Sequence, residues 1–262
     1  MIPSEGGTFE LSRSQYGIGK DATLRVLAVT KESYEIRNLV TLTGDGAYLD
    51  TGIADSDCTG VEFGASVQEG GSWNTIIFGS KNSCWNKSSN KGVSVCKSGQ
   101  SWKNWYVVVE GKEVGSSATG NGWAAKNELS IRDGLVAMNG TQFGTEITSS
   151  ALGTSGSNLY LGRASDEDSV ILQDWYYLKL YGSEDRLVRD YVPAKRLSDA
   201  AVGFFDKVNE TFSPSSGDQD FVAGSTKAGE LSVYSTAMCS ESFTVPMTTL
   251  AVAGDLLTVT VP

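Results

Sequence analysis

The chain has 262 residues, 40% of them hydrophobic, and a formal net charge of −10 at pH 7 with a pI near 4.6. This composition excludes a disordered chain, and the length suits one β domain with extensions that needs no disulfide or metal to hold its core. An acidic chain lacks the basic footprint that nucleic acids and anionic membranes require, so we expect neither partner. The simplest interpretation of the charge is solubility. The alternative is self-repulsion that keeps copies apart until they assemble.

Residues 1–40 carry a β pattern without a targeting signal. The segments TFELSR, ATLRVLAVT and SYEIRNLV alternate, or nearly so, between polar and apolar residues, which predicts two or three short strands. The opening MIPSEGGTFELSRSQ has neither the basic nor the apolar part of a signal peptide. No apolar run approaches the ~18 residues that cross a bilayer. We therefore expect a protein that stays in the cytosol or leaves it by cell lysis or inside a virion.

Short apolar segments separated by glycine, serine and asparagine fill residues 41–225. Asp133-Gly134 and Asn139-Gly140 are the strongest short hairpin signals, so NELSIRDGLVAMNGTQF predicts three consecutive antiparallel strands. Turn signals at this spacing are typical of a sandwich or jelly roll. Further strands are predicted over GVEFGASV, TIIFGS, GVSVCKS, WYVVVEGKEV (with a turn at Glu110-Gly111-Lys112), NLYLGR and WYYLKLYG.

The strand around Trp175 has aromatic residues on both faces. Strict alternation predicts Tyr176, Leu178 and Leu180 on one face. It predicts Trp175, Tyr177, Lys179 and Tyr181 on the other. One set belongs to the core. The other forms a binding platform or is covered by the terminal extensions, and we favour the covered arrangement.

The segment from Leu187 to Phe212 predicts the closing edge of the sandwich. Its first apolar run ends at Pro193, which we expect to stop ladder pairing because proline has no N–H to donate. Apolar residues resume at Val202, and DKVNE at residues 206–210 predicts a turn.

Residues 226–262 again suggest strands, in ELSVYSTAM, SFTVPM, TTLAVAGD and LLTVTVP. An apolar strand at the end of a chain invites aggregation unless another strand pairs with it. The partner is either the N-terminal strands or a neighbouring subunit.

Several segments together resemble a known fold family. They are AYLDTGI at residues 47–53, SNLYLGRA at 157–164, WYYLKLYGSEDRLVRDYVPAKR at 175–196, the remainder of 187–212, and FVAG at 221–224. They are similar to the concanavalin A-like (laminin-G-like) jelly-roll domain that is common in structural proteins of tailed bacteriophages and prophages. The resemblance implies an all-β antiparallel sandwich with β-rich extensions. Its expected regions are an N-terminal attachment region (1–40), the jelly roll (41–225) and a C-terminal extension for assembly or docking (226–262).

The same resemblance implies a non-enzymatic virion protein assembled in the host cytoplasm, as a head decoration, head fibre or tail component. Its expected partners are other virion structural proteins, further copies of itself in a homo-oligomer, and host-surface glycans. The fold hosts lectins, glycosidases and structural modules alike, so it identifies no ligand. A lectin-like module of a gut bacterium is the alternative, and a glycoside hydrolase is the third class.

Loop tryptophans are the candidate glycan-binding residues. Trp73, Trp85, Trp102 and Trp123 lie in segments rich in glycine, serine and asparagine. Exposed indole rings stack on the C–H faces of sugars, and neighbouring amides and carboxylates bond hydroxyls. The alternative is that these rings cap the sandwich or bury against a partner protein.

Acidic residues near one strand are the candidate calcium ligands. Asp50, Asp55 and Asp57 lie close in sequence, and the resemblance to laminin-G-like domains implies that calcium can bind at one rim. The piece from Asp55 fails as an EF-hand because Ser66 stands where a bidentate glutamate is required. Solvated loops are the alternative interpretation, here and for the second cluster at residues 166–168. We expect no other cofactor.

Catalysis receives little support from the sequence. Glucanases on this fold place carboxylates on one strand in an E-x-D-x-x-E pattern, which is absent here. The chain has no histidine, which excludes Ser-His-Asp and Cys-His devices and makes zinc unexpected. Cys84 and Cys96 bracket a polar loop and can face each other across a hairpin. Reduced, buried thiols are the default for a cytosolic product, and this default also covers Cys58 and Cys239.

Overall fold

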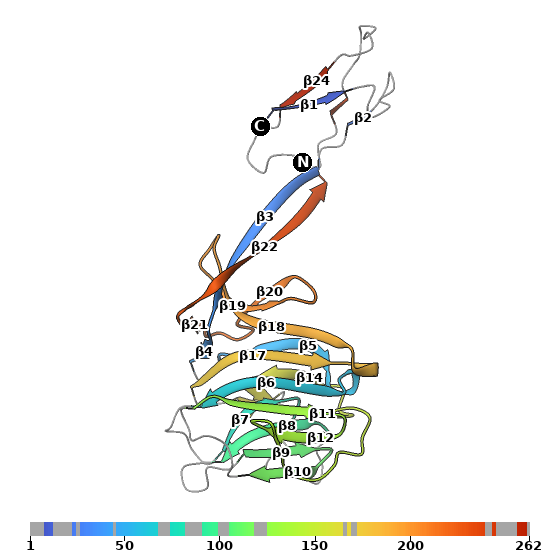
Figure 1. Cartoon of the computed structure of the whole chain (residues 1–262), viewed down its shortest axis with the longest axis vertical. Coiled ribbons are helices and arrows are strands. Elements are labelled where there is room, and N and C mark those ends of the chain that lie inside the picture. The colour runs from blue at the N-terminus through green and yellow to red at the C-terminus, as the bar shows by residue number, and fades with distance from the viewer. Residues whose placement is uncertain are drawn as a thin grey trace. The chain divides into compact units, whose positions relative to one another are not determined.

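The computed structural model shows an all-β protein built from antiparallel sheets (Figure 1). It describes residues 8–12, 23–24, 27–43, 46–67, 74–81, 91–98, 105–117, 125–164, 167–168, 172–238, 243–244 and 256–260.

The smaller sheet of the sandwich has six strands in the order β10-β9-β8-β7-β14-β5. These strands are β5 (Leu49–Ala54), β7 (Asn74–Gly79), β8 (Val93–Ser98), β9 (Trp105–Val109), β10 (Lys112–Ser117) and β14 (Asn158–Leu161). At the β5 edge, the Asp50 N–H donates to Ser216 Oγ and the Ser216 N–H donates to the Tyr48 carbonyl. The segment around Ser216 therefore pairs with backbone groups of this edge that an open sheet would leave to water or to another chain.

The larger sheet has twelve strands among the described residues. Its main path runs β13-β12-β11-β6-β17-β18-β19-β20, while β4 pairs with β17 and β21, and β3 pairs with β18 and β22. The bounds are β3 (Leu27–Arg37), β4 (Val40–Leu42), β6 (Gly60–Val67), β11 (Asn127–Arg132), β12 (Leu135–Met138), β13 (Thr141–Gln142), β17 (Gln173–Tyr181), β18 (Leu187–Arg196), β19 (Val202–Asp206), β20 (Thr211–Pro214), β21 (Phe221–Ala223) and β22 (Thr226–Met238).

The hydrophobic core lies between these two sheets. Phe63 on β6 approaches Phe78 on β7, with ring centroids 5.8 Å apart, and Trp175 on β17, at 5.0 Å. All three rings are fully buried. Burying side chains of this size contributes about 1.5–3 kcal/mol each, so aromatic packing between the sheets is a main source of stability. The antiparallel sandwich expected from the sequence is confirmed.

The predicted hairpins are also present. Asp133, Gly134, Asn139 and Gly140 all have positive φ, between 50° and 76°, as tight hairpin turns require. They join β11, β12 and β13 into three consecutive antiparallel strands. Glu110 and Gly111 (φ 51° and 73°) likewise form the turn between β9 and β10.

The expectation that Pro193 stops ladder pairing is wrong. Pro193 lies inside β18 and is paired with Phe204 of β19. The Arg196 N–H points toward β19, because it donates to Ala201, so by alternation the nitrogen of Pro193 faces the opposite edge. On that edge the pairing with β17 ends at Tyr191 and the pairing with β3 begins at Ala194. The missing N–H therefore falls where β18 changes partners.

The predicted faces of β17 are wrong at two residues, because a β-bulge between Trp175 and Tyr177 shifts the register against β6. Trp175 therefore joins Leu178 and Leu180 in the core, and all three are fully buried. Tyr176 is only half-buried and leaves the core set.

The chain divides into two compact units. The sandwich unit comprises Tyr34–Leu231, and the terminal unit combines Met1–Ser33 with Ser232–Pro262. In the terminal unit, β1 (Thr8–Ser12) pairs with β24 (Leu256–Thr260), and β2 (Thr23–Leu24) pairs with β23 (Phe243–Thr244). Of the two partners considered for the last strand, the structure shows the N-terminal strand of the same chain. The divisions lie 7 and 6 residues from the predicted boundaries at 40/41 and 225/226, respectively.

Candidate functional site

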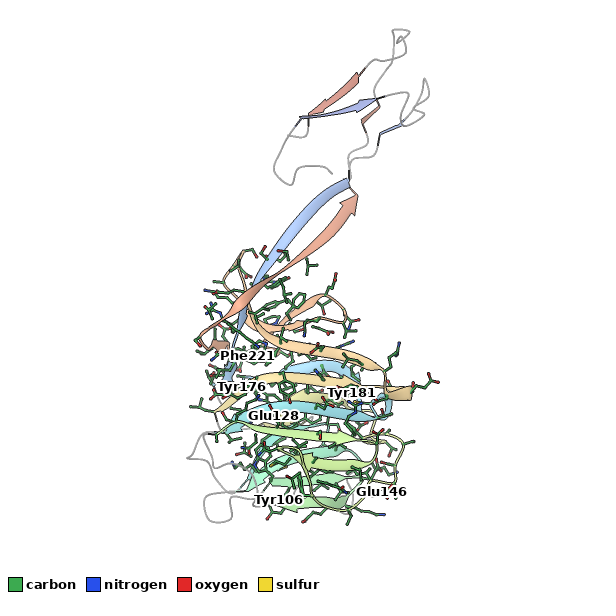
Figure 2. The ribbon with its side chains drawn as sticks, in the orientation of Figure 1. Tyr106, Glu128, Glu146, Tyr176, Tyr181 and Phe221 are labelled. Atoms are coloured by element: carbon green, nitrogen blue, oxygen red, sulfur yellow. The ribbon has the colours of Figure 1, made fainter. Side chains whose placement is uncertain are left out.

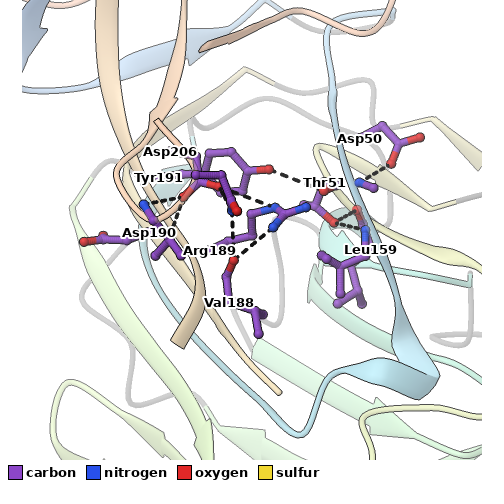
Figure 3. Close-up of polar contacts among 12 residues, drawn as sticks. Asp50, Thr51, Leu159, Val188, Arg189, Asp190, Tyr191 and Asp206 are labelled. Carbon is purple, nitrogen blue, oxygen red and sulfur yellow. Dashed lines mark hydrogen bonds and ion pairs between the residues drawn. The ribbon is translucent and has the colours of Figure 1, made fainter. Parts of the chain in front are cut away.

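A fully buried carboxylate, Asp206, holds the turn between β19 and β20 (Figure 3). Its Oδ1 accepts hydrogen bonds from the N–H groups of Asp190 (2.9 Å) and Val208 (3.0 Å). Its Oδ2 accepts from Asn209 Nδ2 (2.7 Å) and lies 3.5 Å from the Arg189 Nε. Three hydrogen bonds and an ion pair use most of the acceptor capacity of a carboxylate, so Asp206 serves the fold.

Tyr191 connects the two sheets beside Asp206. Its hydroxyl donates to the Thr51 carbonyl (3.4 Å), and the Thr51 Oγ1 donates to the Leu159 carbonyl (2.9 Å), which links β18 to β5 and β14 (Figure 3). Burial raises the pKa of Tyr191 to about 12, and the negative charge of Asp206 acts in the same direction. Neutral Tyr191 is therefore a hydrogen-bond donor between the sheets and not a base.

Asp55, predicted as a calcium ligand, is fully buried and bonded to neutral donors. Its Oδ2 accepts from the hydroxyls of Ser80 (2.7 Å) and Ser155 (2.5 Å), and its Oδ1 accepts from the Gly156 N–H (2.9 Å). A Cβ atom at position 153 would collide with this carboxylate, so glycine is required there. Asp55 thus ties β5, β7 and the loop before β14 together.

The other two predicted calcium ligands lie in different settings. Asp57 is exposed in the 3₁₀ turn η1 (Asp55–Asp57), whereas Asp50 on β5 accepts hydrogen bonds from Gly52 N–H and Asn158 Nδ2. Within the described ranges, no three His, Cys, Asp or Glu side chains form a group able to hold a metal ion. Calcium binding stays a prediction.

The four predicted glycan-binding tryptophans, Trp73, Trp85, Trp102 and Trp123, lie outside the described residues, and their role also stays a prediction. In the second acidic cluster, Glu167 and Asp168 form β16 (Glu167–Asp168), which pairs with β15 (Arg163–Ala164), while Asp166 is outside the described residues.

Tyrosines on the outer face of the large sheet lie beneath cations of that same sheet. Lys126 Nζ is 5.2 Å from the ring centroid of Tyr176 and 5.4 Å from that of Tyr177. The Arg132 guanidinium lies 3.4 Å from the ring centroid of Tyr181 and pairs with Glu62 (2.7 Å). Figure 2 labels Tyr176 and Tyr181 along β17. Among the described residues, these cations lie over the three rings. That the terminal extensions cover this face stays a prediction.

A group of residues that sequence reasoning did not assemble lies on the outer face of the small sheet. Tyr48 and Tyr160 meet edge to face with ring centroids 6.1 Å apart, and the Arg163 guanidinium is 4.3 Å from the ring of Tyr48. Asp50 is the cross-strand partner of Tyr160 and is bonded to Asn158. The alternation in YLD (48–50) and NLY (158–160) points each of these four away from the core. Only the pairing of β5 with β14 brings them together.

The cysteines depart in part from the expectation of reduced thiols. Cys58 is a free, buried thiol that donates to the Gly60 carbonyl, and burial raises its pKa to about 11. Cys96, in contrast, is disulfide-bonded, and its partner lies outside the described residues. Cys96 packs with Ile76 and Ala164 in a second small apolar cluster.

Comparisons with known proteins assign no family. No family model matches the chain, and no curated protein matches it. Within the described part of the chain, no helix has the length and apolar character of a membrane span.

Proposed function

We propose that this chain is a non-enzymatic structural protein of a tailed-bacteriophage virion, in which the sandwich is displayed and the terminal unit attaches it. The setting rests on the resemblance of residues 41–225 to concanavalin A-like domains of phage structural proteins. One geometric observation supports separate roles for the sandwich and the terminal unit. It is the way in which the chain enters and leaves the sandwich.

The incoming and outgoing strands of the sandwich are paired with each other. β3 pairs with β22, and the Asn38 N–H donates to the Ser225 carbonyl (3.0 Å). The hydroxyls of Ser33 and Ser232, which stand at the two points where the chain passes between units, lie 3.3 Å apart. A domain whose two connections leave side by side has a single attachment, which is the arrangement that a displayed module needs.

The described polar residues of the sandwich suit a structural role. Asp55 and Asp206 are both fully buried and both occupied by donors from the protein. Such carboxylates stabilise loops and turns, whereas a catalytic pair must face a substrate. The alternative function, a lectin-like module of a gut bacterium, is favoured by the Tyr48–Tyr160 group on the small sheet.

Mass spectrometry of density-gradient-purified particles tests this proposal. We expect the chain to copurify with capsid, portal or tail proteins of the lysate in which it is expressed. If the chain is found in the cell extract but never in particles, the virion assignment is wrong and the lectin-like alternative takes its place.

A further inference from the structure

One segment of the chain follows the side of the sandwich at which both sheets end. The small sheet ends at β10, and the main path of the large sheet ends at β13, beside β12. The chain leaves β13 and continues along this side as a segment that is not itself a strand. We call it the edge strap and define it as residues 143–147 (Figure 2 labels its Glu146). The strap and these strands lie within the described ranges 105–117 and 125–164.

The edge strap is hydrogen-bonded to both sheets. The Phe143 N–H donates to the Val136 carbonyl of β12 (2.9 Å), and the Ile147 N–H donates to the turn between β11 and β12 (2.7 Å). Between them, the Thr145 N–H donates to the Val114 carbonyl of β10 (2.6 Å). Backbone donors spaced two residues apart thus connect first to the large sheet, then to the small sheet, and then to the large sheet again.

The bond from Thr145 meets an irregular point of β10. A β-bulge shifts the register of β10 against β9 between Glu113 and Gly115, so Val114 has no partner residue in β9. A bulge leaves its extra residue outside the ladder, and the strap supplies a donor for the carbonyl of that residue. The opposite edge of the small sheet, at β5, is bonded in a similar way to the segment around Ser216. Both edges of the small sheet are therefore contacted by other segments of the same chain.

Two close approaches hold the strap against β10. The Phe143 ring lies over Gly115, since a Cβ atom at position 115 would stand 2.6 Å from Phe143 Cε2. Gly144 has a φ of +86°, and a Cβ atom there would collide with the Val114 carbonyl oxygen. Phe143 also packs against the hydrophobic core, and Ile147 belongs to it. Glycine at positions 115 and 144 therefore permits a contact that a side chain at either position would push apart.

We propose that the edge strap is a cover that keeps β10 from pairing with a second copy of this chain. An uncovered strand edge presents N–H and C=O groups that another strand can bind. The partner is a second copy because the same displacement frees the same edge in every molecule, and two equal edges pair antiparallel in an isologous contact. The cover does not depend on the virion role, although copies displayed side by side would need it most.

Two matched pairs of substitutions in the full chain test the strap. Gly144→Ala forces the strap away from Val114, whereas Gly140→Ala places the same methyl group at a similar φ of 76° with no other atom within 4 Å. Thr145→Pro removes the N–H that binds β10, whereas Thr145→Ala keeps this N–H and loses only a long hydroxyl contact (3.5 Å). Each pair separates loss of the strap contact from the general cost of the substitution.

We expect light scattering to give concentrated Gly144→Ala and Thr145→Pro a weight-average mass at least twice that of the wild-type chain at the same concentration. The two controls should match the wild-type chain. Hydrogen exchange measured by mass spectrometry should be faster over β10 in the dilute variants and slow again once they associate. Melting curves show whether each variant is folded. The Thr145 side chain is exposed, so Thr145→Pro carries the test if Gly144→Ala does not fold.

Three outcomes overturn the inference. Folded variants that keep the wild-type mass would show that β10 needs no cover. Association that leaves exchange over β10 fast would place the new contact elsewhere. Equal association of Gly140→Ala and Gly144→Ala, or of the two Thr145 variants, would show that the strap contact is not the cause. Each of these results leaves the virion role standing, because that role is tested by the presence of the wild-type chain in particles.

Discussion

Asp55 and Asp206 are two fully buried carboxylates that the fold neutralises in different ways. Asp206 has Arg189 at 3.5 Å in addition to three hydrogen bonds. Asp55 has two serine hydroxyls and one backbone N–H. An unpaired buried charge costs several kcal/mol. The Arg189 cation offsets part of this cost for Asp206, whereas hydrogen bonds from neutral donors offset it for Asp55. These two buried carboxylates thus hold loops and turns in place through their hydrogen bonds. Burial of a carboxylate alone does not identify a reactive site.

The largest expected effect comes from Asp55→Ala. The substitution leaves the buried Ser80 hydroxyl without its acceptor and releases Ser155 and Gly156, so we expect a loss of about 4 kcal/mol in the free energy of unfolding. Urea unfolding followed by tryptophan fluorescence measures it. The matched control is Asp57→Ala, an exposed neighbour that should change stability by less than about 0.5 kcal/mol. Equal effects of the two substitutions would show that the hydrogen bonds of Asp55 do not stabilise the fold.

Asp206→Ala should cost somewhat less, about 3 kcal/mol, because Arg189 is partly exposed and can turn to water. Arg189→Met in turn should cost only about 1 kcal/mol, since Asp206 keeps its three hydrogen bonds. The same unfolding assay decides between hydrogen bonds and the ion pair. If Arg189→Met destabilises the sandwich as much as Asp206→Ala, the ion pair and not the hydrogen bonds stabilises the buried Asp206 carboxylate.

Cys58 reports locally on the Asp55 region. Its N–H donates to the Asp55 carbonyl, its thiol is fully buried, and its pKa is raised to about 11, so alkylation at pH 8 requires opening of this region. We expect Asp55→Ala to accelerate iodoacetamide labelling of Cys58 at least tenfold, which corresponds to about 1.4 kcal/mol of easier opening. Peptide mapping by mass spectrometry measures the rate. Asp206→Ala should leave the rate unchanged, and equal acceleration would mean that both carboxylates hold one cooperative unit.

The smallest expected effect concerns Tyr191. The pKa of Tyr191 is about 12 in the folded protein against 10.0 for a tyrosine in water, so the neutral side chain contributes stability below pH 10 that is lost as the pH rises through about 12. At neutral pH, Tyr191→Phe should cost about 0.5–1 kcal/mol by removing the bond to the Thr51 carbonyl. Above pH 10 the difference between the two proteins should shrink. Unfolding curves at pH 8 and pH 11 measure this, and a constant difference would contradict the assigned ionisation.

Local chemistry made the fold largely predictable from the sequence. Asp133-Gly134 and Asn139-Gly140 favour positive φ wherever they occur, so their hairpins could be placed without knowledge of the rest of the chain. The glycine, serine and asparagine clusters that separate the apolar segments likewise placed β6 at Gly60–Val67, which is the predicted segment.

Interactions between strands account for the predictions that were wrong. Alternation cannot reveal a bulge, so Trp175 was placed on the wrong face. Pro193 breaks pairing only if a donor is needed at its position, and the change of partner from β17 to β3 removes that need.

The candidate site was less predictable for a similar reason. Asp50 was chosen for its proximity in sequence to Asp55 and Asp57, but its cross-strand partner is Tyr160, which lies 110 residues further along the chain. A single sequence holds no signal for that pairing, since register depends on packing of the whole sheet. The sequence shows only two segments, YLD and NLY, in which one leucine separates a tyrosine from a polar residue.

The pairing of β1 with β24 and of β2 with β23 also sets an order of events during synthesis. The first strands emerge from the ribosome some 220 residues or more before their partners, whereas every strand of the small sheet is complete by Leu161. Domains fold as units while the chain is being made, so the sandwich forms first. The terminal unit closes only after β23 and β24 have been made, and contacts of such long sequence separation form slowly. A chain whose synthesis stops before Leu256 would therefore contain every strand of the sandwich but not β24, the partner of β1.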